Sequence, residues 1–537
     1  MKDPMQTNAA PNNNMRWIIV LLSACFLVLA FFGAYLSGAD GDEGMYLLQA
    51  RSFAEYGSLP GIDYYSGQTA GFFILYGVFM KIFGYSFEVA RMLSVFLYFG
   101  TVCFFYLIAK RLSNNQWAAL FLAAIFICNH AFFKTDILMK HYAPCNFFLM
   151  GCVYFLIRST YDSERPAQSL HYFLAGLFLG LAFNSRFHLI VALIPFIVLW
   201  VTVIHWIEKR KAVQCVRNIG YSFCGFWVAS PIFLYVLWKN PVGLYFNHYL
   251  YPLVLSPARY LNQPALWENL RDCFWAGLNK QNFLIVLIAV VAIVPCFFSR
   301  GSDENKKRYA LLFVIAAAIV FLYSLSPIRL GPSHYSQATP YWSLLAMPAV
   351  LAFLHLRLRR AVVAMTFSII LLGSFAFLAY IPLVHHRDGI IRSQKVWSSL
   401  GTMQQLGDAV SKITHKGEYI IDWYCAAAFL SGTRNVKGFE QAFDVTQLTT
   451  SFIPDEGLTN PPAISKKQLR EMIQQQAVNV IVVNEAGDGY YTSREFRRLV
   501  EENYVLYQSV NGHKIYVTTH RLMELHAQTL GIHSAIN

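Results

Sequence analysis

Long apolar runs recur along this 537-residue chain, each close to the ~20 residues that a helix needs to cross a bilayer. Charged residues make up only 14% of the sequence, against roughly 25% in soluble domains. We therefore predict a polytopic α-helical membrane protein with about eleven transmembrane helices. The predicted spans are approximately 17–38, 88–109, 117–133, 143–158, 169–185, 187–206, 217–238, 281–299, 308–325, 340–356 and 361–383.

The distribution of Lys and Arg predicts which loops lie inside. The net charge is +13, and many basic residues fall in short loops, such as 110–111 and 209–211. With a disordered, cytoplasmic N-terminus over 1–16, every such cluster lies on the inner side, as the positive-inside rule expects. The apolar run 71–85 is short and contains Lys81, and a crossing there would invert all later loops. We expect a juxtamembrane helix at 71–85, and we read the positive charge as a topology signal rather than as a nucleic-acid interface.

This topology places several regions together on the outer side of the membrane domain, which we assign to residues 17–384. They include the turn at 184–188 and the loops 39–87, 134–142, 239–280 and 326–340.

The polar region 385–537 is also expected outside, as a soluble α/β domain. EYIIDW and VNVIVVN are typical of strands, KKQLREMIQQQ and TSREFRRLVEEN of helices, and YVLYQSVNGHKIYV of a hairpin turning at Asn511-Gly512. Neither GxGxxG nor GxxxxGK[ST] occurs in this domain, and the ten cysteines form no CxxC or metal-ligand spacing.

Two carboxylates, Asp42 and Glu43, lie just after the first apolar run. Carboxylates are costly near hydrocarbon and are usually kept there for function. Asp42 is a candidate general base, since partial desolvation at a membrane interface raises a carboxyl pKa. The alternative is that both acids favour the N-terminus of the helix that follows.

Five segments, in this order, resemble the GT-C glycosyltransferases. The resemblance is in particular to the bacterial branch related to protein O-mannosyltransferases and aminoarabinose transferases, similar to glycosyltransferase family 39. The segments are GDEGMYLLQARSFAEYG (41–57), DYYSGQTAGFFILYGVF (63–79), EVARMLSVFLYFGTVCFFYLIAKRL (88–112), GLAFNSRFHLIVALIPFIVLW (180–200) and HYSQATPYWSLLAMP (334–348).

The resemblance implies a GT-C type membrane fold and an enzyme that takes a hexosyl or pentosyl group from a polyprenyl-phosphate carrier. It would pass the sugar to a lipid, glycan or protein acceptor on the extracytoplasmic face of a bacterial inner membrane, with inversion. Asp42 matches the catalytic carboxylate of the family, and Asp136 is the candidate for its second acidic position. Gln68 stands where many relatives carry Lys, and Met45 where aminoarabinose transferases carry Arg, which argues against aminoarabinose as the sugar.

Several further residues on the predicted outer side are candidates for catalysis or for binding the carrier phosphate and the sugar. Glu43 would orient Asp42, bind a metal, or simply occupy the first helical turn. Arg186 is the preferred phosphate ligand, because its forked donors suit oxyanions, although an Arg there can also extend to lipid headgroups. The other candidates are Gln68, Lys140, His141, His334, Tyr335 and Gln337.

Cofactors and function class stay open at this stage. Some relatives bind a divalent cation near the acidic pair, so Asp42, Glu43 and His334 form a candidate metal site. The main alternative function is a transporter or flippase of lipid-linked sugars, although no internal repeat is present. A second alternative is a membrane-anchored binding protein whose C-terminal domain recognises a glycan or peptide.

Overall fold

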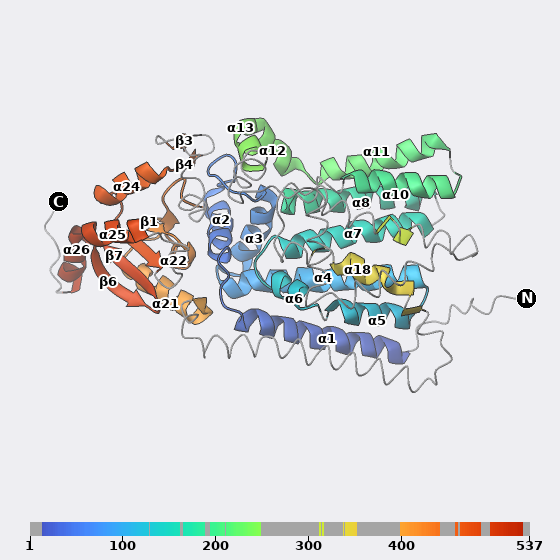
Figure 1. Ribbon diagram of the computed structural model, residues 1–537, viewed down its shortest axis with the longest axis horizontal. Helices are drawn as coiled ribbons and strands as arrows, with labels where there is room; N and C mark the ends of the chain where they lie inside the picture. Colours follow the sequence, from blue (N-terminus) through green and yellow to red (C-terminus); the bar gives the residue numbers. More distant parts are fainter. Residues whose placement is uncertain are drawn as a thin grey trace, which may run out of the picture.

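In a computed structural model, the chain forms a bundle of long helices whose one end abuts a smaller α/β domain (Figure 1). The structure describes residues 13–127, 129–161, 165–187, 194–209, 211–248, 311–312, 314–315, 337, 339–348, 350–351, 398–440, 457–459, 462–484 and 494–529. The chain enters the bundle at the end far from the α/β domain and reaches the near end where the first helix stops.

The bundle is built from helices that run roughly side by side (Figure 1). Among the described residues, Trp17–Leu36 and Phe87–Ser113 are long and apolar enough to cross a membrane, and a bent pair makes a third. The predicted total of eleven includes segments outside the described residues and stays a prediction. The helices of the bundle are α1 Asn13–Leu36, α4 Phe87–Ser113, α5 Gln116–Ile127, α6 His130–Asp136, α7 Tyr142–Tyr161, α8 Arg165–Ser185, α10 Ile194–Ile207, α11 Ala212–Val228, α12 Pro231–Lys239, α13 Pro241–Tyr245 and α18 Thr339–Leu345.

Two segments predicted as single spans are broken. The segment 217–238 bends by 65° between α11 and α12. Pro231 occupies the first turn of α12, where its missing N–H costs nothing, and the hydroxyl of Ser230 donates to the carbonyl of Phe226 at 2.8 Å. The segment 117–133 divides into α5 and α6, because Asn129 caps α6 with its side-chain oxygen, which accepts from the backbone of Phe132 at 2.9 Å.

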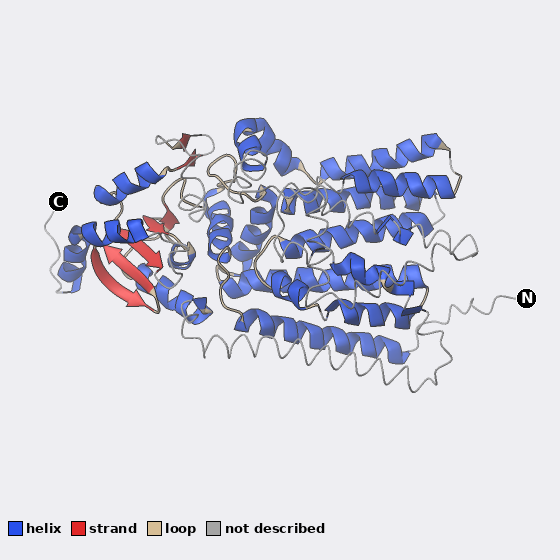
Figure 2. Cartoon of the chain, in the orientation of Figure 1, coloured by secondary structure: helices blue, strands red, loops and turns tan. Residues whose placement is uncertain are grey.

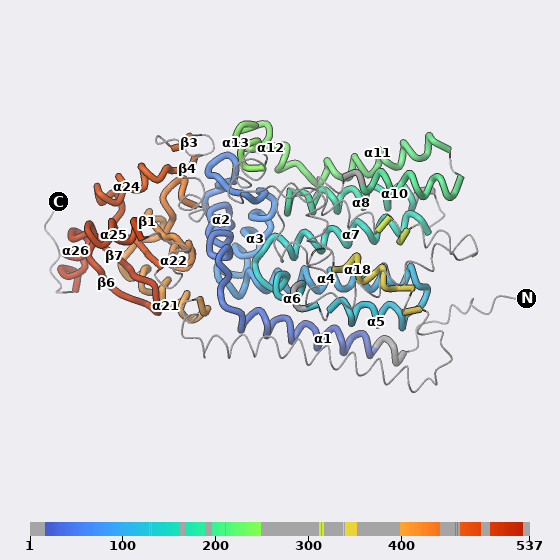
Figure 3. Tube along the Cα trace, in the orientation of Figure 1, coloured from blue at the N-terminus to red at the C-terminus, as the bar shows by residue number. Residues whose placement is uncertain are grey.

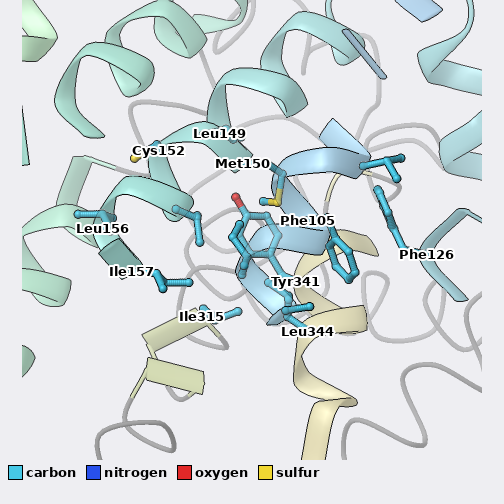
Figure 4. Packing of buried hydrophobic residues seen from close by; sticks show 14 of the residues in the cluster. Phe105, Phe126, Leu149, Met150, Cys152, Leu156, Ile157, Ile315, Tyr341 and Leu344 are labelled. Atoms are coloured by element: carbon cyan, nitrogen blue, oxygen red, sulfur yellow. The ribbon is translucent and has the colours of Figure 1, made fainter. Parts of the chain in front are cut away.

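The bundle core joins segments far apart in the sequence. Figure 3 shows α18, from the second half of the chain, beside α4 and α5. The fully buried Tyr341 of α18 packs into the hydrophobic cluster around Phe105, Phe126 and Met150 (Figure 4). The rings of Phe105 and Phe126 stack at 4.7 Å. This packing joins α4, α5, α7 and α18 inside the bundle.

Two shorter helices, α2 Glu43–Tyr56 and α3 Ala70–Phe83, lie across the end of the bundle (Figure 1). Helix α3 corresponds to the predicted juxtamembrane run 71–85. The two helices are in backbone contact, since a methyl group on Gly77 would come within 2.4 Å of the carbonyl oxygen of Ala50. These crosswise helices form the layer between the bundle and the C-terminal domain.

The predicted C-terminal α/β domain is confirmed. Its five-stranded sheet has the order β2-β1-β5-β7-β6, in which β1 pairs in parallel with β2 and β5, and β7 pairs antiparallel with β5 and β6 (Figure 2). The hairpin turns at Asn511 and Gly512, whose φ angles of 45° and 90° match a type I′ turn. The elements of the domain are α21 Leu400–Ser411, β1 Tyr419–Asp422, α22 Ala426–Ser431, β2 Arg434–Asn435, β3 Leu458–Thr459, β4 Pro462–Ala463, α24 Lys466–Gln474, β5 Val480–Asn484, α25 Arg494–Asn503, β6 Val505–Val510, β7 His513–Val517 and α26 Thr519–Thr529.

The C-terminal domain packs directly on α2. A methyl group on Gly44 would lie 2.3 Å from the carbonyl oxygen of Tyr424, so only glycine permits this approach. The hydroxyl of Tyr424 donates to the carbonyls of Ala39 and Asp40 at 3.1 and 2.9 Å. Further along α2, Arg51 donates to the carbonyl of Phe429. The turn that carries Asp42 is therefore held from the side of the α/β domain.

Candidate functional site

The turn between α1 and α2 carries two carboxylates that share one cation. The ammonium group of Lys140 lies 2.7 Å from Oδ1 of Asp40 and 3.7 Å from Oδ2 of Asp42. Lys140 comes from the predicted outer loop 134–142 and is nearly buried, whereas the Asp42 side chain is 47% exposed. Asp42 is thus the more exposed of the two carboxylates, since the Asp40 side chain is 33% exposed.

The pKa values of the two carboxyl groups are shifted in opposite directions. For Asp42, loss of solvating water raises the pKa, as do the nearby charges of Asp40 and Glu43, and these outweigh the attraction of Lys140. For Asp40, desolvation also favours the neutral form, but the close contact with Lys140 outweighs it and lowers the pKa. The predicted base, Asp42, is therefore the more basic of the two.

Glu43 is engaged in structural contacts. Its side chain is fully buried, and its two oxygens accept from Nε and Nη2 of Arg91 on α4 at 2.8 and 2.6 Å. The same oxygens accept from the backbone N–H groups of Asp40 and Met139 at 3.0 Å each. Glu43 therefore joins α2 and α4 to the turn before α2 and to the loop 134–142, and it orients the residues around Asp42.

A second set of polar side chains forms a hydrogen-bonded chain in the bundle. Asn146 donates to the carboxyl oxygens of Asp136 at 3.2 and 2.9 Å. The amide of Gln337 donates to the oxygen of Asn146 at 3.4 Å, and Arg186 donates to the oxygen of Gln337 at 2.6 Å. Three predicted residues, Asp136, Arg186 and Gln337, are thus brought together, although α6, α8 and the residues before α18 are distant in sequence.

Both ends of this chain are buried. Asp136 is fully buried, and the loss of solvating water raises its pKa to about 7, despite the hydrogen bonds from Asn146 and Thr135. At the other end, the guanidinium of Arg186 lies over the ring of Tyr142, 4.8 Å from its centroid. Arg186 is 6% exposed, which does not fit a side chain that extends to lipid headgroups.

The loop 134–142 connects the two clusters. Asp136 lies near the start of the loop, as the last residue of α6. Further along, the backbone N–H of Met139 donates to Glu43, and Lys140 pairs with Asp40. Tyr76 on α3 lies within electrostatic range of both Asp136 and Glu43. A substrate at Asp42 is therefore next to the loop that also carries Asp136 of the second cluster.

Gln68 and His141 lie beside Tyr46 on α2. The amide of Gln68 donates to the hydroxyl of Tyr46 at 3.3 Å, and the rings of Tyr46 and His141 are 6.2 Å apart. The backbone N–H of Tyr46 donates to the carbonyl of Asp42, so Gln68 lies about one helical turn from the acidic pair. His334 and Tyr335 lie outside the described residues.

Three residues of the site were not among the predicted ones: Asp40, Arg91 and Asn146. Arg91 carried a signal, since a lone Arg inside an apolar helix is expensive unless it is paired. Asp40 also carried one, as the first of three acids in ADGDE. Asn146 carried none, because an amide in a helix of ordinary composition points to no partner.

The three residues of the candidate metal site, Asp42, Glu43 and His334, do not form a common set of ligands among the described residues. Both oxygens of Glu43 are already used by Arg91 and two backbone N–H groups. Asp42 has Lys140 as its neighbouring positive charge, and His334 lies outside the described residues. Among the residues that the structure describes, no group of three or more His, Cys, Asp or Glu side chains is arranged to hold a metal ion.

Comparisons with known proteins agree with this architecture. The apo crystal structure of ArnT from Cupriavidus metallidurans has a TM-score of 0.65 and 13% identity over 96% of this chain and 99% of that one. The crystal structure of the same ArnT bound to undecaprenyl phosphate has a TM-score of 0.62 and 12% identity, over 93% of this chain and 97% of that one. The chain has the GT-C fold of ArnT. The predicted resemblance is confirmed for the fold across nearly the whole length of both proteins.

The sequence itself matches over a shorter stretch. Residues 69–237, less than half of the chain, match the family described as dolichyl-phosphate-mannose-protein mannosyltransferase. The oligosaccharyltransferase of Archaeoglobus fulgidus is similar at 14% identity, with a TM-score of 0.45, over 92% of this chain and 73% of that one. No curated protein sequence matches the chain.

Proposed function

We propose that this membrane protein is a glycosyltransferase that moves a sugar from a polyprenyl-phosphate carrier to an acceptor hydroxyl. The observation that carries the proposal is Asp42, a half-exposed carboxylate with a raised pKa, held beside the nearly buried cation Lys140. The support from outside the chain is the fold shared with ArnT, which has been crystallised with undecaprenyl phosphate, and the mannosyltransferase family match.

In this reaction Asp42 acts as the general base. Its carboxylate takes the proton of the acceptor hydroxyl, and the oxygen attacks the anomeric carbon of the sugar. The bond from that carbon to the phosphate oxygen breaks, and the polyprenyl phosphate leaves with the electron pair. Attack opposite to the leaving group inverts the anomeric centre. The raised pKa makes Asp42 a better proton acceptor than an ordinary carboxylate.

The leaving phosphate needs positive charge, and two cations of this chain can provide it. Lys140 lies at the acidic cluster, and Arg186 presents a planar fork of donors that matches phosphate oxygens. Gln337 and Tyr142 hold the guanidinium of Arg186 in place. These residues substitute for the cations that relatives place at the positions of Met45 and Gln68.

The proposed setting is a bacterial inner membrane, with Asp42 and the C-terminal domain on the extracytoplasmic side. The positive-inside pattern of the loops supports this orientation. The acceptor is a lipid, a glycan or a protein that carries a free hydroxyl. Membrane lipids surround the bundle, and a bound divalent cation stays part of the proposal without a role in the steps above.

Mass analysis of envelope glycolipids and glycoproteins, in cells with and without the gene, tests the function. Loss of the protein is expected to remove one sugar from a defined acceptor and to leave the polyprenyl-phosphate sugar unused. An assay with purified protein in vesicles distinguishes a glycosyltransferase from a flippase. A flippase moves the intact carrier-linked sugar across the bilayer without releasing polyprenyl phosphate.

A further inference from the structure

A polar cavity lies between the membrane domain and the C-terminal domain, away from Asp42. One wall comes from α2 and the loop after it, with Asp63 and Tyr64, and the other from the sheet region, with Tyr419, Arg434 and Glu440. Its volume is about 140 Å³. The mechanism above uses none of these side chains.

The cavity is lined by groups of both charge types. Asp63 and Glu440 contribute carboxyl groups, while Arg434 and Lys437 contribute basic ones. An anionic ligand would meet the carboxylate of Asp63, and a cationic ligand would meet the two basic groups. A neutral ligand that is rich in hydroxyl groups can use both kinds, because each hydroxyl donates one hydrogen bond and accepts others.

Tyr64, whose side chain ends in a buried hydroxyl, is one of the residues that line the cavity. Tyr64 is 1% exposed, and its oxygen has no hydrogen-bond partner within the described part of the chain. It lies in the electrostatic field of Asp63 and Glu440, which also line the cavity. A buried hydroxyl without a partner is costly, and a ligand hydroxyl at this position would satisfy it.

The carboxyl group of Glu440 favours its protonated, neutral form. Burial raises the pKa of its carboxyl to about 8, although backbone N–H groups oppose the shift. One of its oxygens accepts from the backbone N–H of Gly438 at 2.8 Å. Near neutral pH the group can therefore donate as well as accept, as a sugar hydroxyl requires.

The cavity also has a rigid aromatic side. The guanidinium of Arg434 lies between two rings, 5.0 Å from the centroid of Tyr419 and 4.2 Å from that of Tyr56. Tyr419 is 43% exposed, so part of its ring is open to a ligand. The apolar face of a sugar ring can pack on such a surface while its hydroxyls reach the polar groups.

We propose that this cavity, with Tyr64, Asp63, Glu440 and Arg434, binds one sugar unit of a glycan acceptor. The inference rests on the proposed function, because it assigns the acceptor class of the same reaction. Ser52, which lines the cavity, lies ten residues after Asp42 along α2, a rise of ~15 Å. An acceptor seated here therefore reaches the base as a chain of several sugars.

The test is binding of fluorescently labelled, full-length protein to an array of defined oligosaccharides and, in parallel, to an array of peptides. The variants Tyr64→Phe and Glu440→Gln keep the size of each side chain and remove hydrogen-bonding capacity. Gln405→Ala, in a separate groove of the C-terminal domain, is the matched control. Thermal unfolding confirms that each variant folds, since the Tyr64 hydroxyl makes no hydrogen bond with the described residues.

We expect the unmodified protein to bind a subset of the oligosaccharides and each cavity variant to bind them roughly tenfold more weakly, with Gln405→Ala unchanged. Equal binding by the cavity variants, absence of oligosaccharide binding, or binding to peptides instead would overturn the assignment. A separate assay tests the proposed function: if the protein releases no polyprenyl phosphate from the donor, the proposed function fails, whatever the array shows.

Discussion

Arg91 and Glu43 form a two-point ion pair inside the protein, with Nη2–Oε2 at 2.6 Å and Nε–Oε1 at 2.8 Å. Both side chains are almost fully buried. Arg91 also donates to the carbonyls of Ala34, Ser37 and Gly38, which the end of α1 leaves without helical partners. One arginine thus fixes the exit of α1, the start of α2 and the Asp42 turn between them.

Replacing Arg91 with Leu should destabilise the protein strongly. The change leaves Glu43 buried without its counter-ion, which typically costs about 3–5 kcal/mol. Thermal unfolding of the full-length protein in detergent measures the loss. The control is Arg498→Ala in the exposed pair with Glu502, where the expected change is within about 0.5 kcal/mol. Equal shifts for the two variants would refute the structural role of Arg91.

Gly44→Ala should separate α2 from the C-terminal domain. The added methyl group would meet the backbone carbonyl of Tyr424 at 2.3 Å, and a backbone atom cannot move aside as a flexible side chain can. We expect a destabilisation of about 1–3 kcal/mol and faster proteolysis after residue 397. Gly401→Ala is the control, because nothing lies near its added methyl group in α21, where Ala favours the helix. Similar proteolysis of the two variants would contradict the tight contact at Gly44.

The sequence predicts individual helices, strands and turns better than it predicts which side chains pair with one another. Apolar length predicts α4, the apolar run VNVIVVN predicts a buried strand of the sheet, and Asn511-Gly512 predicts the hairpin turn, because local physics decides each of them. The pairing of Arg91 with Glu43 and the chain from Asp136 to Arg186 depend on how helices pack in three dimensions. No local pattern encodes that packing.

The broken spans show the same limit from another side. Ser230-Pro231 is a visible break signal, yet a hydropathy window averages over it, so 217–238 reads as one span. Asn129 likewise interrupts an apolar run by capping α6. In both cases a single residue with a specific hydrogen bond overrides the hydrophobic average.

Asp136 should make stability fall as pH rises toward neutrality. Its pKa is near 4 in an unfolded chain and about 7 in the folded protein, because burial disfavours the charged form. The folded state therefore holds the proton more tightly. The contribution of this bound proton to the free energy of unfolding is complete below about pH 4 and is lost as the pH rises through about 7.

The measurement is the midpoint of thermal unfolding from pH 4 to pH 8 for the unmodified protein and for Asp136→Asn. The difference between the two curves should change from pH 4 to about pH 7 and be flat above about pH 7. Asp408→Asn, at an exposed position of helix α21, is the matched control. A constant difference at all pH values would show that Asp136 is already charged in the folded state.

Arg186→Lys should slow the release of polyprenyl phosphate by roughly 10–100-fold. Lysine keeps the positive charge but loses the planar fork and the stacking on Tyr142. The rate is followed with a radiolabelled polyprenyl-phosphate sugar and purified protein. Arg498→Lys, on an exposed helix, serves as control and should retain full activity. A normal rate for Arg186→Lys would remove Arg186 from the phosphate site.

The most direct test of the account is the transfer rate of Asp42→Asn, a change that keeps the shape of the side chain and removes its basicity. With polyprenyl-phosphate sugar and acceptor extract supplied to purified protein, we predict a loss of about 10²–10⁴-fold, as for removal of a general base. Asp408→Asn should transfer at the normal rate, and thermal unfolding should show that both variants are folded. Transfer by Asp42→Asn at the rate of the unmodified protein would contradict the assignment of Asp42 as the base.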